Sequence, residues 1–318
     1  MLEVSNLNKR MGGQVVIDGL SFEIAEGGIH VILGPDGAGK STLLDIISGC
    51  RAAESGRVTI CGEEMTVTSL DQKRRIGYMP EDMPLYEDMT VQEYLVFIGE
   101  AKGVSPEKLY KNINSALELT TLDTVSGRLI KKLSAGEKKL LGIAQAMLGN
   151  PDIIILDEPT ASMTRIQKAC FEDLMGKLGR IKTVIIATRS LSALDGLCED
   201  LMMISRGKLI AHDTKKALEE KLCAVKTLTL TVRGSEESIV SALESVGSVT
   251  DCTFSKRSGG TVSVKIEYDT DRDIRDEVFR AFAAVNCPIL SMETTTLTLD
   301  DVYMKLTGES DGKGGKEK

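Results

Sequence analysis

The strongest pattern in the chain is a set of short, uninterrupted apolar segments. Ile153–Leu156 and Val184–Ala187 each carry four apolar side chains in a row, and Ile29–Leu33 carries four around a single histidine. Apolar runs of this kind fit central parallel strands, which are covered on both faces. These segments therefore predict the core of a parallel sheet.

Shorter β-rich segments and a helical region surround these runs. Leu2–Leu7, Val15–Ile24 and Val58–Ile60 are predicted as strands, and the region from residue 91 to about residue 149 carries apolar side chains at helical spacing. Alternation of strands and helices over residues 1–222 predicts a doubly wound α/β core.

The pattern changes after residue 222. Leu228, Leu230 and Val232 alternate with threonines, which is the period of a half-buried strand. The elements predicted next are the helix Ser235–Val246, the strand Val249–Ser255, the turn Gly259–Gly260, the strand Thr261–Tyr268, the helix Asp271–Val285 and the strand Pro288–Thr295. The order βαββαβ is the ferredoxin-like arrangement. We therefore expect residues 223–307 to form a small α+β ferredoxin-like domain with a last helix at Asp300–Leu306, and the glycine- and charge-rich tail 308–318 to be disordered.

A glycine-rich segment directly follows the strand predicted at Ile29–Leu33. Its residues are Gly34, Pro35, Asp36, Gly37, Ala38, Gly39, Lys40, Ser41 and Thr42. Glycines let successive backbone N–H groups turn inward around an anion, and the start of the next helix adds partial positive charge. In a phosphate-binding loop of this spacing, the Lys40 ammonium group reaches the β- and γ-phosphates and the Ser41 hydroxyl ligates Mg²⁺. The segment predicts binding of a nucleoside triphosphate.

Two carboxylates follow the apolar run Ile153–Leu156. Asp157 stands at the end of this predicted strand, where it would lie beside the phosphate-binding loop and hold Mg²⁺ through water. Glu158 is then placed to orient or deprotonate the attacking water. The alternative, two solvated acids at a strand end, is disfavoured beside a phosphate-binding loop.

Composition narrows the class of protein. A formal net charge of -8 argues against a nucleic-acid-binding face. No apolar run approaches the roughly 18 residues of a membrane span, and the first residues lack the features of a signal peptide. The seven cysteines are scattered singly, which indicates neither a zinc site nor a disulfide framework. We expect a cytoplasmic protein, unless a membrane partner holds it at a surface.

A third motif precedes the strand that ends at Asp157. Leu133, Ser134, Ala135, Gly136 and Glu137 are similar to the LSGGQ signature of the ATP-binding subunits of ATP-binding cassette (ABC) transporters. With the phosphate-binding loop and the Asp-Glu strand in the same order, they make residues 1–222 resemble the nucleotide-binding domain of that family. The resemblance implies a P-loop NTPase fold with a RecA-like parallel core, an antiparallel β subdomain and a helical subdomain.

The resemblance also implies a dimer. In that family, the signature serine and the helix that it caps close on the γ-phosphate bound to the other subunit. Ser134 and the backbone amides at a helix N-terminus would form an anion site that has no phosphate of its own. Because the chain has one phosphate-binding loop and one signature, the resemblance implies two ATP molecules held in a homodimer, or in a heterodimer with a second cassette.

Other segments resemble regions that act with a membrane subunit. Ile76–Glu81 is similar to the segment that ends at the Q-loop, which makes Glu81 a third implied Mg²⁺ ligand. Pro84–Val91 resembles the groove for the coupling helix of the membrane subunit, and Thr298–Tyr303 with the domain before it resembles the extension of exporter-type ATPases. These similarities imply an integral membrane permease as partner and a peripheral location on the inner face of the cell membrane.

Five positions depart from the family pattern. Glu81 and Glu137 stand where glutamine is usual, and Met11 replaces the aromatic side chain that stacks on adenine, which forfeits about 1 kcal/mol. Thr164 lies where the D-loop ends in aspartate, and Arg189 lies where the switch histidine is expected. An arginine donates to a phosphate but neither accepts a hydrogen bond nor shuttles a proton.

These departures leave two functions open. The first is ATP hydrolysis that drives export through a separate membrane subunit, with Glu158 activating water and Arg189 stabilising charge in the transition state. The second is a catalytically weak nucleotide-binding module that dimerises with an intact cassette subunit and regulates it. In the second case, Arg189 pairs with Glu158 and withdraws the base.

Overall fold

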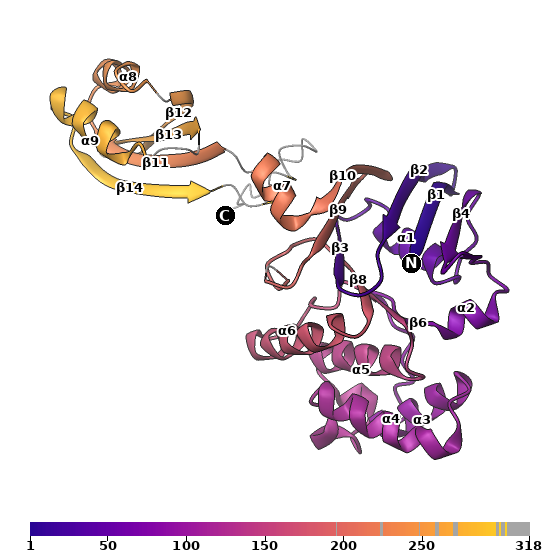
Figure 1. Cartoon of the computed structure of the whole chain (residues 1–318). Helices are drawn as coiled ribbons and strands as arrows, with labels where there is room; N and C mark the ends of the chain where they lie inside the picture. Colours follow the sequence, from indigo (N-terminus) through magenta and orange to yellow (C-terminus); the bar gives the residue numbers. More distant parts are fainter. Residues whose placement is uncertain are drawn as a thin grey trace. The chain divides into compact units, whose positions relative to one another are not determined.

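The computed structural model describes residues 1–194, 196–222, 225–247, 249–257, 261–269 and 273–296, together with residues 299 and 303 (Figure 1). The chain divides into two compact units, Met1–Lys215 and Lys216–Lys318. The turn predicted at Gly259–Gly260, most of the helix predicted at Asp300–Leu306 and the tail predicted at 308–318 lie outside the described residues.

A six-stranded sheet forms the centre of the first unit. Its strand order is β10-β9-β3-β8-β7-β6, and all neighbouring strands are parallel except β9 and β10. Every residue of β3, β7 and β8 is buried, as the uninterrupted apolar runs predict. The bounds are β3 Ile29–Leu33, β6 Ile76–Met79, β7 Ile153–Asp157, β8 Thr183–Thr188, β9 Asp200–Ser205 and β10 Lys208–Thr214.

A smaller antiparallel sheet of order β2-β1-β4-β5 packs against this core. Its bounds are β1 Leu2–Met11, β2 Gln14–Ile24, β4 Ser55–Ile60 and β5 Glu63–Glu64. Apolar side chains from both sheets meet those of α1 (Lys40–Ile47) in one buried cluster. Burial of this shared apolar surface fixes the antiparallel sheet against the start of α1.

The region predicted as helical contains three α-helices, α3 Val91–Ala101, α4 Pro106–Leu119 and α5 Ala135–Met147, with 3₁₀ turns at Asp123–Val125 and Ile130–Lys132. Helix starts follow from the sequence. The Thr90 hydroxyl accepts from the Glu93 N–H while the Glu93 carboxylate accepts from the Thr90 N–H, a capping box that begins α3. Pro106 occupies the first turn of α4, where its missing N–H removes no helical hydrogen bond. The remaining helices of the unit are α2 Leu70–Arg74 and α6 Arg165–Gly179.

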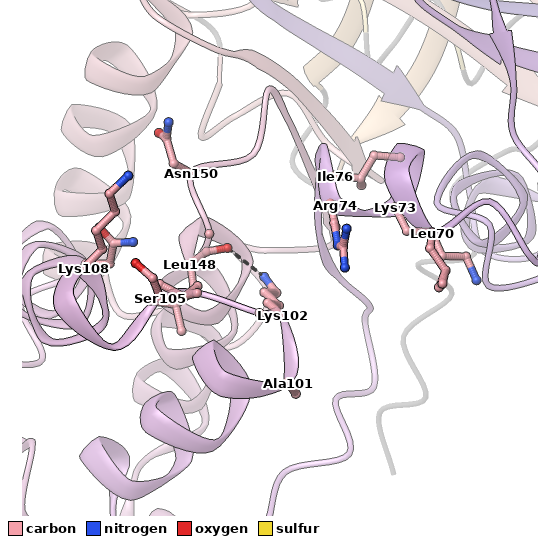
Figure 2. A pocket seen from close by; sticks show the side chains of 14 residues that line it. Leu70, Lys73, Arg74, Ile76, Ala101, Lys102, Ser105, Lys108, Leu148 and Asn150 are labelled. Carbon is pink, nitrogen blue, oxygen red and sulfur yellow. Dashed lines mark hydrogen bonds between the residues drawn. The ribbon is translucent and has the colours of Figure 1, made fainter.

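A cavity of about 990 Å³ lies where α2, the α3–α4 connection and the α5–β7 connection meet (Figure 2). Lys102 lines this cavity and turns its ammonium group toward the end of α5. Its Nζ donates to the backbone carbonyl oxygens of Gln145, Ala146 and Leu148, at 2.6, 3.3 and 3.2 Å. Carbonyl groups in the last turn of a helix have no helical partner, so Lys102 satisfies the C-terminal end of α5.

Lys102 should make the stability of the fold depend on pH. Burial lowers the pKa of Lys102 to about 8, below the ordinary value of about 10.4. Between these two values the unfolded chain binds more protons at this position than the folded chain, so the stability that Lys102 contributes rises with pH. We therefore expect the wild type to gain about 2 kcal/mol of unfolding free energy relative to Lys102→Met when the pH is raised from 7.5 to 10. Urea denaturation at both pH values measures it, and an unchanged difference would contradict the burial of this ammonium group.

The second unit is built around a four-stranded antiparallel sheet of order β12-β13-β11-β14. Its elements follow the order βαββαβ: β11 Val225–Arg233, α8 Glu236–Glu244, β12 Val249–Arg257, β13 Thr261–Asp269, α9 Arg275–Ala284 and β14 Ile289–Thr296. Both helices lie over one face of the sheet, where Leu228, Leu230 and Val264 are fully buried against α8 and α9 (Figure 1). Helix α7, Lys215–Leu222, precedes β11. Among the helices that the structure describes, none combines the length and the apolar character of a membrane span.

Candidate functional site

The glycine-rich loop lies between β3 and α1 and needs its glycines for close packing. Gly39 has a φ of 100°, which places it in the left-handed region that favours glycine. A Cβ atom at Gly39 would lie 2.6 Å from the carbonyl oxygen of Val16, and one at Gly34 would lie 2.5 Å from that of Ile204. Strands β2 and β9 therefore approach the loop so closely that side chains are excluded at both positions.

Lys40 is the first residue of α1, and its side chain is only 6% exposed. Its Nζ donates to the backbone carbonyl oxygens of Gly34 at 2.7 Å and Pro35 at 3.0 Å, and it lies 3.7 Å from Oε1 of Glu158. The ammonium group is thus folded back over its own loop and reaches the residue that follows β7.

Asp157 and Glu158 bring two buried carboxylates to the same place. They are 1% and 5% exposed. In the part of the chain that the structure describes, three of their oxygens have no hydrogen-bond partner: both carboxylate oxygens of Asp157 and Oε1 of Glu158. Burial raises the pKa of both carboxyls; the Ser41 hydroxyl opposes the rise most strongly at Asp157, and the Lys40 ammonium group does so at Glu158. Buried carboxylates that are so poorly supplied with hydrogen bonds are suited to receive a cation or a proton.

The backbone at Glu158 is strained. Its φ of 45° lies in the left-handed region, which a residue with a Cβ atom rarely adopts. The Glu158 N–H donates to the Ala187 carbonyl oxygen at 2.9 Å, which holds this conformation against the end of β8. Strain of this kind persists only where the surrounding structure fixes it, and it is concentrated at functional sites.

Arg189 follows β8 and joins the loop to Glu158. Its Nε lies 3.4 Å from Oε1 of Glu158, and its Nη1 donates to Oδ2 of Asp36 at 3.0 Å. Glu158, with Asp36 in support, holds the pKa of Arg189 above its ordinary value. The ion pair with Glu158 that the sequence suggested is therefore present. The contact with Asp36 was not predicted, because it joins residues 153 positions apart.

The signature residues form the start of α5. The Ser134 hydroxyl accepts from the Glu137 N–H at 3.2 Å, and the Glu137 carboxylate accepts from the Ser134 N–H at 2.7 Å. This capping box shows what the glutamate at position 137 does within the chain, and a glutamine could make the same contact. A side chain at Gly136 would collide with the carboxamide of Gln167 on α6. Among the described residues, no hydrogen bond or ion pair joins the segment Leu133–Glu137 to the glycine-rich loop.

Thr164 and Met11 occupy defined positions. Thr164 caps α6: its hydroxyl accepts from the Gln167 N–H, and the Gln167 side chain accepts from the Thr164 N–H. Met11 is 40% exposed at the end of β1, and the Thr42 hydroxyl donates to its sulfur at 3.8 Å. The side chain that replaces the expected aromatic therefore does flank the start of α1. Thr164 has a local structural role that the comparison with a D-loop aspartate did not reveal.

Glu81 follows β6 and is exposed, and its charge acts on Asp157, Glu158 and Arg189. The site therefore combines the glycine-rich loop with residues from the ends of β6, β7 and β8. Sequence reasoning missed one contact here: Lys139 on α5 donates to the Glu81 backbone carbonyl oxygen. In the sequence, only its place two residues after the signature distinguished this lysine.

A strand, a phosphate-binding loop and an acidic strand end in this arrangement define a P-loop nucleotide-binding protein. Residues 17–161 match the ABC transporter family. The linearmycin resistance ATP-binding protein LnrL of Bacillus subtilis (strain 168) is 27% identical over 311 residues, which cover 98% of this chain and 99% of that protein. The Nod factor export ATP-binding protein I of Burkholderia lata is 32% identical over 220 residues, 69% of this chain and 72% of that protein. The chain belongs to the ATP-binding cassette proteins of ABC transporters, which confirms the resemblance drawn from its motifs.

Solved structures agree with this assignment. The structure of cbiO1 from Clostridium perfringens, part of the ABC transporter complex cbiONQ, has 26% identity and a TM-score of 0.61, and the match covers 69% of this chain and 91% of that one. A dimeric post-hydrolysis state of an ATP-binding cassette bound to ADP and Pi has 25% identity and a TM-score of 0.62, with coverage of 67% and 98%. Cassettes of this family bind ATP and are ATPases.

Proposed function

We propose that this chain is the ATP-hydrolysing subunit of an ABC exporter and acts through a separate membrane permease. One observation carries the proposal: Lys40, Asp157 and Glu158 meet at one buried point beside a glycine-rich loop that has no room for a side chain at Gly34 or Gly39. The direction of transport is supported by relatives named for linearmycin resistance and Nod factor export.

The residues present fit MgATP. Backbone N–H groups of the glycine-rich loop and the Lys40 ammonium group bind the phosphates. Ser41, Glu81 and Asp157 supply the oxygen ligands that Mg²⁺ prefers, and the two unpartnered oxygens of Asp157 are suited to a cation or to its water ligands. Across the described ranges, no cluster of three His, Cys, Asp or Glu side chains could hold a metal ion alone, so this site would depend on phosphate oxygens. When bound, Mg²⁺ neutralises phosphate charge.

Glu158 is the proposed general base. Its burial raises its pKa toward neutrality, which strengthens its carboxylate as a proton acceptor. Lys40 and Arg189 lie on the same carboxylate oxygen and keep it ionised. When phosphates draw Lys40 and Arg189 toward themselves, this oxygen is released to receive the proton of the attacking water.

Ser134 is proposed to act on the ATP of a second cassette. It begins the 13-residue helix α5 and is exposed. The partial positive charge at this helix N-terminus then favours the γ-phosphate of the partner. The dimeric structure of a similar cassette bound to ADP and Pi supports the formation of a dimer.

The Ser134→Asp variant tests the dimer. Aspartate caps a helix as well as serine does, so α5 should remain folded while a negative charge enters the proposed anion site. We expect MgATP to shift purified wild type from monomer to dimer, and to leave Ser134→Asp monomeric. Light scattering coupled to size-exclusion chromatography measures the masses.

The matched control is Ser235→Asp. Ser235 caps α8 in the second unit by the same hydroxyl contact, here with the Ser238 N–H. This variant should dimerise like wild type. If Ser134→Asp also dimerises with MgATP, Ser134 does not contribute to the dimer interface.

The permease is proposed to dock near the start of α3. Tyr86 and Phe97 are 51% and 41% exposed and pack edge to face at 5.3 Å between ring centroids. Exposed aromatic side chains of this kind are enriched at protein interfaces. Docking there would hold the chain peripherally on the inner face of the cell membrane.

We further propose that residues 1–222 form the cassette and residues 223–307 a ferredoxin-like accessory domain.

A second candidate function rests on Arg189. Arg189 contacts both Glu158 and Asp36, so it would keep the proposed general base and the glycine-rich loop paired with itself. In that case the chain is a weakly hydrolysing module that dimerises with an intact cassette and regulates it. Comparing the hydrolysis rates of wild type and Glu158→Gln distinguishes the two functions.

A further inference from the structure

The loop that carries Glu81 is fastened to the segment that carries the signature. In the backbone, the Ile130 N–H donates to the Met89 carbonyl oxygen at 2.9 Å, and the Val91 N–H donates to the Arg128 carbonyl oxygen at 3.1 Å. These contacts hold the end of the loop. They leave its beginning, next to Glu81, to be fixed by side chains.

Three lysines of α5 and of the turn before it contact the loop through their side chains, two near its end and one at its beginning. Lys138 pairs with Glu87 and Lys131 pairs with Asp88, each at 2.7 Å. Both carboxylates are more than half exposed, and ion pairs of this kind contribute little. The third contact differs, because the Lys139 Nζ donates to the backbone carbonyl oxygen of Glu81 at 2.6 Å. It fixes the main chain of the loop at the point where it enters the site.

The charge of Lys139 also faces the site. Four carboxylates act on this ammonium group, those of Glu81, Asp157, Asp82 and Glu158. Lys139 lies five residues beyond Ser134 on the same helix. Lys139 is therefore connected to the signature through the backbone of α5 and to the Glu81 backbone through a hydrogen bond.

We propose that Lys139 is a positioning residue that fixes the Glu81 loop to the signature helix, so that Glu81 and Ser134 move as one body. The hydrogen bond transmits displacement of either part to the other, because a helix of this length moves as a unit. Loss of the bond leaves the phosphate-binding loop intact and frees the Glu81 backbone from α5. The consequence for turnover rests on the proposed ATPase function, whereas the consequence for the loop does not.

Hydrogen exchange of the nucleotide-free protein tests the loop directly. Lys139→Met keeps the aliphatic stem and removes the ammonium group, and we expect the amides of the non-proline residues among 80–89 to exchange about tenfold faster. Lys139→Arg retains a donor and should restore slow exchange. Lys111→Met, the same substitution at an exposed position on α4, should match wild type. Equal exchange at residues 80–89 in wild type and Lys139→Met overturns the proposal.

Two further readouts separate positioning from general destabilisation. Exchange in β7 should stay unchanged in Lys139→Met, and faster exchange throughout the first unit would overturn the positioning role. In steady-state ATP hydrolysis, kcat should fall about tenfold while KM stays within about twofold, and Lys139→Arg should recover kcat. If wild type shows no hydrolysis, the proposed function fails, and the exchange experiment still decides the role of Lys139.

Discussion

Lys40→Ala is expected to weaken MgATP binding by a factor of about a hundred or more. The wild-type ammonium group is buried and already sits on the carbonyl oxygens of Gly34 and Pro35, so little rearrangement is needed before it meets a phosphate. The substitution removes two or more charge-assisted hydrogen bonds, each contributing roughly 1.5–3 kcal/mol. Isothermal titration calorimetry with MgATP measures the change.

The control for Lys40→Ala is Lys208→Ala. Lys208 is 65% exposed in β10 and pairs with Asp18 on the surface, so its loss should leave the affinity for MgATP unchanged. Thermal unfolding of both variants checks that the first unit remains folded. Wild-type affinity in Lys40→Ala, or no heat of binding in wild type, would refute the assignment of this loop as the phosphate site.

Glu158→Gln is expected to keep MgATP binding and to lower the rate of hydrolysis by about a hundredfold or more. The carboxamide has nearly the same shape as the carboxylate, so packing in this buried position is preserved. It cannot accept a proton from the attacking water, and it no longer pairs with Lys40 or Arg189. Release of inorganic phosphate under steady-state conditions, with the membrane partner present, measures the rate.

The Arg189→His variant completes this experiment. If wild type and Glu158→Gln turn over equally slowly, Glu158 does not act as the base and the regulatory module is favoured. A large gain in rate from Arg189→His would then identify the arginine as a brake on that module. If wild type hydrolyses ATP and Arg189→His reduces the rate, the arginine stabilises charge in the reaction.

The fold was predictable where its signal is local. Apolar runs gave β7 and β8, because a strand buried on both faces has no polar position to vary. Capping residues and Pro106 account for where helices begin within the region predicted only as helical. The strand order of the central sheet could not be obtained in this way, since pairing depends on packing between segments far apart in sequence.

The candidate site was likewise predictable only where its residues are close together in sequence. The glycine-rich loop, the Asp157–Glu158 pair and the signature are contiguous motifs, so their residue types and spacing along the chain are enough to identify them. The structural roles of the residues that depart from the family pattern could not be predicted from the sequence. Thr164 looked like the loss of a carboxylate, whereas in the structure its hydroxyl caps α6. Glu137 stands where glutamine is usual, and in the structure its carboxylate accepts from the Ser134 N–H, a contact that a glutamine could also make.

The amino-acid sequence alone determined the family, the nucleotide and the order of the main elements, because each is encoded in neighbouring residues. Tertiary structure alone decided that Arg189 holds both Asp36 and Glu158, and that Lys139 holds the backbone of Glu81. Such contacts join chain segments brought together by burial of apolar surface, and no short pattern specifies which side chains will then lie within hydrogen-bond distance.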